Sequence, residues 1–126
     1  MGDQPTILIA DRNAHVRGFL KRELTAEGYQ VRLAENGKQV LKGVFHPDPL
    51  DLIILDPDLP DSDENILLKR LQDRIPSLPI IIHAFRSDNE FHWLLTTDAV
   101  FVEKGGKSIE CLKLLVAEIL ARKKSK

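Results

Sequence analysis

The sequence predicts an α/β domain built on a parallel β-sheet with helices on both faces. Aliphatic runs of strand length alternate along the chain with segments of helical period, five times over. Parallel strands need long crossover connections, and a right-handed crossover normally carries a helix that packs on the sheet. The chain has 126 residues, which suits one such domain.

The predicted strands are aliphatic runs, as expected where a strand is buried on both faces of a sheet. Leu52–Leu55 is the clearest, and Thr6–Ala10 and Ile80–Ile82 have the same character. We predict two further strands, at Tyr29–Ala34, where apolar and polar side chains alternate, and at Ala99–Glu103.

The predicted helices are marked by apolar side chains spaced three and four residues apart. The first ends near Gly28, the second opens at Asn36, the third starts near Ser62, and the last follows Gly105. We predict the fourth over Ser87–Thr97, from the spacing of its apolar residues. The side chains expected on the apolar stripes are Val16, Phe19, Leu20, Leu24, Val40, Leu41, Val44, Phe45, Ile66, Leu67, Leu71, Phe91, Leu94, Leu95, Ile109, Leu112, Leu115, Val116, Ile119 and Leu120.

Composition excludes several classes of protein. The 18 basic and 19 acidic residues argue against a nucleic-acid partner, because a nucleic-acid module normally carries a basic excess. A single cysteine, Cys111, excludes an internal disulfide framework and fits a reducing, cytoplasmic location. No run approaches the roughly 20 apolar residues of a membrane span, so we expect no membrane partner.

Charged residues stand where three predicted strands end. Asp11 follows the first strand, Asp56 the third and Lys104 the fifth. The carboxyl ends of parallel strands meet at one edge of the sheet, where open α/β sheets bind their ligands. Two carboxylates and an ammonium there suit a hard cation or a phosphoryl group. The alternative is that each aspartate merely caps the following helix or turn.

Five stretches together resemble the receiver domain of two-component response regulators, of the chemotaxis-regulator type. They occur in the family's order and spacing at Ile7–Asp11, Gly28–Val31, Ala34–Gly37, Asp51–Pro60 and Phe101–Lys104. The resemblance implies a flavodoxin-like (βα)5 three-layer sandwich whose five-stranded parallel sheet has the order 2-1-3-4-5. Because the chain ends once its last predicted helix is complete, we expect residues 1–126 to be a single receiver domain without an output domain.

The resemblance also implies roles for individual residues. Asp56 would accept a phosphoryl group from a sensor histidine kinase or a phosphotransfer protein, and Lys104 would pair with the phosphoryl oxygens. Mg²⁺ would be held by Asp11, Asp56 and the backbone carbonyl of Asp58, and Phe101 would be the switch aromatic. The chemistry would amount at most to autocatalytic phosphoryl transfer and self-dephosphorylation. The resemblance implies a downstream protein bound by the fourth helix, fifth strand and last helix, and it leaves a homodimer open.

Three positions depart from the family pattern. Arg12 replaces the second acidic residue, and we expect its guanidinium to lean toward Asp56 or Asp11 and to weaken Mg²⁺ binding, partly standing in for the metal. The usual switch hydroxyl falls on Ala84, or on His83 if the register slips by one residue. Gly105 follows the lysine where proline is common, which predicts a softer loop.

Other functions remain to be weighed. Arg12 and Ala84 favour a phosphorylation-independent pseudo-receiver that works as an interaction module, whereas the retained Asp56 and Lys104 oppose it. A haloacid-dehalogenase-type phosphohydrolase would use Asp56 as nucleophile and Asp58 as general acid, but Pro60 does not fit that motif. A calcium loop starting at Asp61 fails because Ile66 stands where glycine is needed.

Overall fold

The computed structural model describes residues 4–61, 63–85 and 99–124. Within these ranges the elements follow one another as β1 (Thr6–Ala10), α1 (Ala14–Ala26), β2 (Gln30–Ala34), α2 (Gly37–Val44), β3 (Leu52–Leu55), α3 (Glu64–Gln72), β4 (Ile80–Ala84), β5 (Val100–Glu103) and α4 (Ser108–Lys124). All strand pairs are parallel, and the sheet order is β2-β1-β3-β4-β5. The predicted sheet and its strand order are confirmed.

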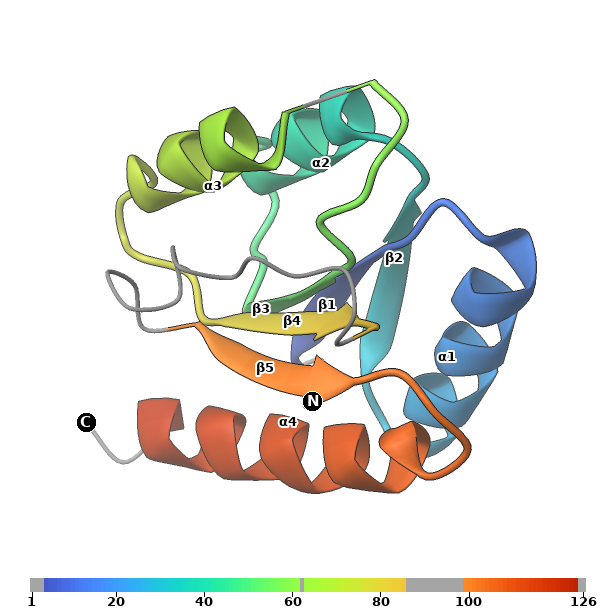
Figure 1. Ribbon diagram of the computed structural model, residues 1–126. Coiled ribbons are helices and arrows are strands. Elements are labelled where there is room, and N and C mark those ends of the chain that lie inside the picture. Colours follow the sequence, from blue (N-terminus) through green and yellow to red (C-terminus); the bar gives the residue numbers. More distant parts are fainter. Residues whose placement is uncertain (1–3, 62, 86–98, 125–126) are drawn as a thin grey trace.

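The sheet lies between two layers of helices, with α2 and α3 on one face and α1 and α4 on the other (Figure 1). Successive side chains of a strand point to opposite faces of the sheet, so they pack into different cores. In β1, Leu8 and Ala10 face the core under α2 and α3, whereas Ile7 and Ile9 face the core under α1 and α4. Because both faces are covered, β1, β3 and β4 are buried along their whole length.

Side-chain caps fix where the first two helices begin, close to the carboxyl edge of the sheet. The Asn13 carboxamide oxygen accepts hydrogen bonds from the backbone N–H groups of His15 and Val16, and Asn36 caps α2 in the same way. Asp61 accepts further hydrogen bonds at the start of α2, from the N–H groups of Gly37 and Lys38. Asp61, considered above as a calcium ligand, therefore caps a helix.

Several predicted details are wrong or shifted. Ile66, expected to face inward, is 65% exposed, and Leu68 is buried in its place beside Leu67 and Leu71. Successive helical residues are rotated by about 100°, so Ile66 and Leu68 cannot both face the sheet. Phe19 and Phe45 were expected on apolar stripes but are about half exposed.

The predicted boundaries are close to those observed. β2 begins one residue later than predicted, at Gln30, and β5 one residue later, at Val100. The expected start of the third helix at Ser62 and the predicted helix Ser87–Thr97 lie outside the described residues. Across the part of the chain that the structure describes, no helix combines the length and apolar character needed to cross a membrane.

Candidate functional site

Asp11 and Asp56 are held side by side at the carboxyl edge of the sheet. Ala10 of β1 is in register with Leu55 of β3, so the two aspartates follow neighbouring strand ends. The backbone N–H of Asp56 donates to the carbonyl of Ala10 at 2.9 Å, which continues the ladder between the strands. The predicted convergence of these two carboxylates therefore arises from the parallel pairing itself.

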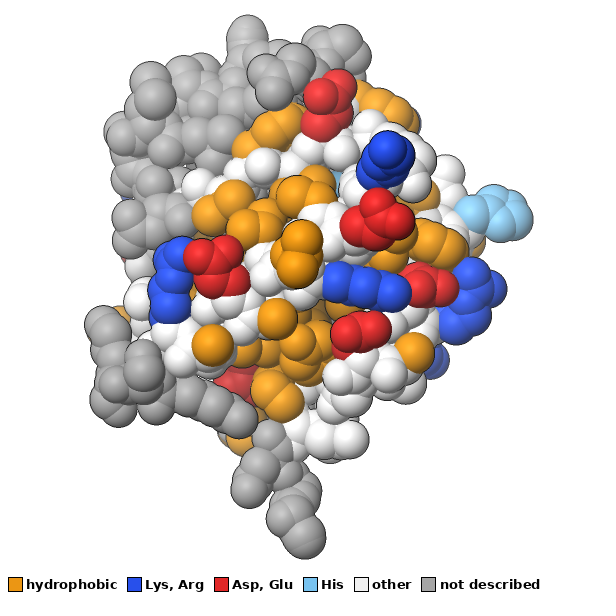
Figure 2. Space-filling model, turned by 90° about the horizontal axis from the view of Figure 1, so that it is seen from below, with side chains coloured by type: hydrophobic (Ala, Val, Ile, Leu, Met, Phe, Trp, Pro, Cys, Tyr) orange, Lys and Arg blue, Asp and Glu red, His pale blue; other side chains and the backbone are white. Residues whose placement is uncertain are grey.

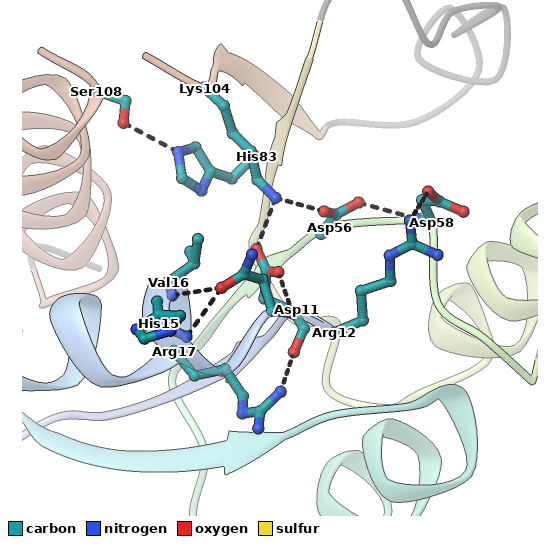
Figure 3. A network of polar contacts seen from close by, with 11 residues as sticks. Asp11, Arg12, His15, Val16, Arg17, Asp56, Asp58, His83, Lys104 and Ser108 are labelled. Atoms are coloured by element: carbon teal, nitrogen blue, oxygen red, sulfur yellow. Dashed lines mark hydrogen bonds and ion pairs between the residues drawn. The ribbon is translucent and has the colours of Figure 1, made fainter. Parts of the chain in front are cut away.

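Lys104, which follows the edge strand β5, completes the cluster at the same edge of the sheet (Figure 3). Its Nζ lies 2.8 Å from Asp11 Oδ2 and 2.6 Å from Asp56 Oδ2, and all three side chains are at most 10% exposed. The Lys104 backbone N–H donates to the carbonyl of Ala84, the last residue of β4. That hydrogen bond fixes the base of the lysine, so one ammonium bridges two buried carboxylates.

The second oxygen of each carboxylate accepts a backbone N–H two residues further on. Asp11 Oδ1 accepts from Asn13 and Asp56 Oδ1 from Asp58, both at 2.9 Å. Arg17 donates from its guanidinium to the backbone carbonyl of Asp11 at 2.7 Å. These local turns lock the orientation of both carboxylates.

The electrostatics of the cluster follow from its burial. Burial raises the pKa of Asp56, and hydrogen bonds from Lys104 and from the Asp58 N–H oppose this rise without cancelling it. For Lys104, burial works to lower the pKa, but hydrogen bonds to Asp11 and Asp56 outweigh it and the pKa is raised. Lys104 is therefore an ammonium ion at neutral pH, and its positive charge lies against both carboxylates.

Arg12 does not make the ion pair expected of it. Its ion pair is with Asp58, at 3.6 Å between Nη2 and Oδ2, rather than with Asp56 or Asp11. The two side chains are 59% and 62% exposed. In Figure 3 the Arg12 side chain extends from beside Asp11 to Asp58. We call this exposed side of the cluster, at Arg12 and Asp58, its mouth.

The residues predicted to be switch positions lie at the end of β4 and in β5. Ala84 is buried and offers only a methyl group, and Phe101 is half-buried against the same core. His83 is buried; its Nε2 lies 3.1 Å from the hydroxyl of Ser108, and its Nδ1 has no hydrogen-bond partner among the described residues. Burial, followed by the charge of Lys104, lowers the pKa of His83 to about 4, with Asp11 opposing.

Sequence reasoning missed Phe85. This residue directly follows β4, and the Lys104 ammonium lies 5.4 Å from the centre of its half-exposed ring. That distance is within the range of a cation–π contact. An aromatic residue after a strand has no distinguishing pattern, so the contact is visible only in three dimensions.

The donor chemistry suits a hard cation only in part. Among residues 4–61, 63–85 and 99–124, no group of three or more His, Cys, Asp or Glu side chains is arranged to hold a metal ion. Mg²⁺, however, commonly uses one or two carboxylates and completes its shell with water or phosphate oxygens. Asp11 and Asp56 fit that minimal set, and the cationic Arg12 at the mouth opposes it.

Comparisons with known proteins identify the family of this fold. A family model described as "Response regulator receiver domain" matches residues 7–104, which include Asp11, Asp56 and Lys104. The chain belongs to this family. It is thus a receiver domain of two-component signalling, as the sequence predicted.

The curated relatives of this receiver domain include longer proteins. The DNA-binding transcriptional regulator NtrC of Proteus hauseri is 34% identical over 82 residues, which are 65% of this chain and 17% of the relative. NtrC of Escherichia coli K12 is 33% identical over 82 residues, with the same coverage. The chain therefore spans about a sixth of the length of these relatives.

Solved structures of receiver domains resemble the whole domain. The response regulator TrrA of Thermotoga maritima, in complex with Mg²⁺–BeF, is 29% identical with a TM-score of 0.77, covering 92% of this chain and 99% of that one. The receiver domain of a putative LuxO repressor protein from Vibrio parahaemolyticus is 27% identical with a TM-score of 0.82, covering 96% and 93%.

Proposed function

We propose that Asp56 accepts a phosphoryl group from a sensor histidine kinase or a phosphotransfer protein, and that the phosphorylated domain signals by protein–protein contact. The observation that carries this proposal is the single ammonium of Lys104 bridging the buried carboxylates of Asp11 and Asp56. Such a cluster offers a nucleophile, a fixed cation and a second anion at the sheet edge where ligands bind.

The transfer step follows from these contacts. A carboxylate oxygen of Asp56 attacks the phosphorus of a phosphohistidine, the P–O bond forms, and the P–N bond breaks with its electron pair leaving on the donor imidazole. Lys104 Nζ, 2.6 Å from Asp56 Oδ2, stays beside the transferred group and neutralises part of its charge. The Asp58 N–H, donating to Asp56 Oδ1, orients the attacking carboxylate.

We also propose that Mg²⁺ assists this step and binds weakly. Asp11, Asp56 and the backbone carbonyl of Asp58 would hold it, and the ion would supply positive charge to the phosphoryl oxygens. The complex of the relative TrrA with Mg²⁺–BeF supports the metal. The guanidinium of Arg12 beside Asp58 supports the weakness, because a like charge opposes a divalent cation.

A contact surface over β5 and α4 is the proposed route to a downstream protein. Leu114 of α4 is 73% exposed, and Val100 of β5 is also exposed. Figure 2 views the molecule from the α4 side, where apolar side chains lie among acidic and basic ones. A mixed surface of this kind suits a protein partner. A homodimer through the same surface is the other occupant to test.

A second candidate is a pseudo-receiver that binds its partner without phosphorylation. Two observations favour it: Arg12 is paired with Asp58, and Ala84 offers no hydroxyl to a phosphoryl group. In that case Lys104 would serve only to neutralise the buried carboxylates.

The test is phosphorylation with acetyl phosphate or phosphoramidate in the presence of Mg²⁺, followed by intact mass. The wild type is compared with Asp56→Asn and with Asp48→Asn, a matched change of a solvent-exposed aspartate. A single phosphoryl adduct on the wild type and on Asp48→Asn, absent from Asp56→Asn, supports the receiver. No adduct on the wild type under forcing conditions supports the pseudo-receiver.

A further inference from the structure

We infer that Arg12 is a resident cation of the phosphoryl site, whose guanidinium leaves Asp58 to bind the oxygens of the phosphoryl group on Asp56. The inference rests on the proposed function and deepens it. It makes phosphoryl transfer in this chain less dependent on Mg²⁺, because a fixed side chain supplies charge that the metal would otherwise provide.

Arg12 lies close to the proposed nucleophile, because its partner Asp58 is bonded to Asp56. It follows Asp11 directly in the chain, and its guanidinium spans to Asp58. The backbone N–H of Asp58 donates to Asp56 Oδ1 at 2.9 Å, so the Arg12–Asp58 pair lies next to the nucleophilic carboxylate (Figure 3). We expect a phosphoryl group added to Asp56 to project toward this exposed pair.

The contact that now holds Arg12 is loose. The distance of 3.6 Å between Arg12 Nη2 and Asp58 Oδ2 is too long for a hydrogen bond, and both side chains are more than half exposed. Exposed ion pairs of this kind contribute little to stability, so Arg12 can leave Asp58 at a small free-energy cost. Lys104, by contrast, makes two short contacts in a buried setting and has no such freedom.

The charge balance favours the exchange. Phosphorylation adds negative charge and three acceptor oxygens to a cluster in which Lys104 already faces two carboxylates. The planar guanidinium of arginine can donate two parallel hydrogen bonds to phosphate oxygens. Its present contact with the Asp58 carboxylate, at 3.6 Å, is too long for a hydrogen bond. Asp58, once released, remains solvated because it is exposed.

The experiment measures how much phosphorylation depends on the metal. The rate of adduct formation with phosphoramidate is followed by intact mass, in MgCl₂ and in EDTA, for the wild type, Arg12→Ala and Arg12→Asp. The control is Arg22→Ala, because Arg22 is 71% exposed on α1 and makes an ion pair of the same length, 3.6 Å, with Glu23. Mg²⁺ binding to the unphosphorylated proteins is measured separately by calorimetry.

Loss of a charge-assisted contact to the transferred group predicts a metal-free rate about tenfold or more lower in Arg12→Ala than in the wild type. Arg22→Ala should keep the wild-type rates in both buffers. Mg²⁺ should bind more tightly to Arg12→Ala than to the wild type, and more tightly again to Arg12→Asp, because a repulsive charge is removed and then replaced by a ligand.

Two results overturn the inference in distinguishable ways. If wild type and Arg12→Ala are phosphorylated on Asp56 with the same ratio of rates in MgCl₂ and EDTA, Arg12 contributes nothing to the group and only the inference fails. If no variant, nor the wild type, gains an adduct on Asp56 in either buffer, the proposed function fails and the inference fails with it.

Discussion

The buried imidazole of His83 should make folding stability fall steeply in mildly acidic solution. The side chain lies between β4 and the start of α4 and is only 4% exposed. Burial, and after it the charge of Lys104, lowers the pKa of His83 from its usual 6.5 to about 4, while Asp11 works in the opposite direction. The folded protein therefore holds this imidazole neutral at pH values where the unfolded chain protonates it.

The sign and size of the effect follow from that difference. Between about pH 6.5 and 4 the unfolded state binds the proton and the folded state does not, so the free energy of unfolding falls as the pH falls. The stabilisation is fully present above pH 6.5 and is lost by about pH 4. A difference of this size in pKa corresponds to about 3 kcal/mol.

The assay is urea unfolding, followed by far-UV circular dichroism across this pH range. In His83→Leu the site keeps a side chain of similar volume that cannot titrate, so the variant should lose about 3 kcal/mol less than the wild type over the same range. His15→Gln, a change of an exposed histidine, should follow the wild type. Parallel curves for His83→Leu and wild type would refute the reasoning, as would an NMR titration that finds His83 protonating near 6.5.

Three further substitutions test the cluster and the local structure that supports it, each by urea unfolding. Lys104→Met leaves two buried carboxylates without their shared cation and should lower the free energy of unfolding by about 3 kcal/mol. Adding Asp56→Asn should restore part of this stability, and a double variant without any recovery would contradict the pairing. Asn13→Ala removes the side-chain cap of α1 and should lower the free energy of unfolding by about 1 kcal/mol. An unchanged free energy of unfolding would show that the cap does not stabilise the domain. Gly28→Ala should cost about 1 kcal/mol, because Gly28 has a φ of 101° and open space around it, so only backbone strain opposes the new methyl group.

The fold could be predicted from sequence because its three central strands, β1, β3 and β4, are buried on both faces. A strand in that setting has no solvent-facing positions, so β1, β3 and β4 appear as unbroken aliphatic runs. The sequence does not determine which side of α3 faces the sheet. In α3 the residues Ile66, Leu67 and Leu68 are all apolar, and only packing against the sheet decides that Ile66 faces solvent.

In the site too, some features could be predicted from sequence and others could not. Asp11, Asp56 and Lys104 follow strand ends, and parallel pairing brings such residues to one edge whatever their separation in sequence. Arg12 and Phe85 follow strand ends too, but their partners depend on side-chain torsions and on loops. A long exposed arginine has many rotamers of similar energy, so its ion pair with Asp58 could not be derived from spacing.

Lys104 lets the buried carboxylate of Asp56 stay ionised, as the proposed phosphoryl transfer requires. A buried aspartate without a cation would become protonated and would lose its nucleophilic oxygen. Here burial raises the pKa of Asp56, which makes its carboxylate more basic, while the ammonium at 2.6 Å favours the ionised form. The same ammonium also holds Asp11 at 2.8 Å, so it cannot move fully toward a new phosphoryl group without abandoning a buried carboxylate. In the proposed transfer, further positive charge would then come from Mg²⁺ or from Arg12, whose ion pair with Asp58 is long and exposed.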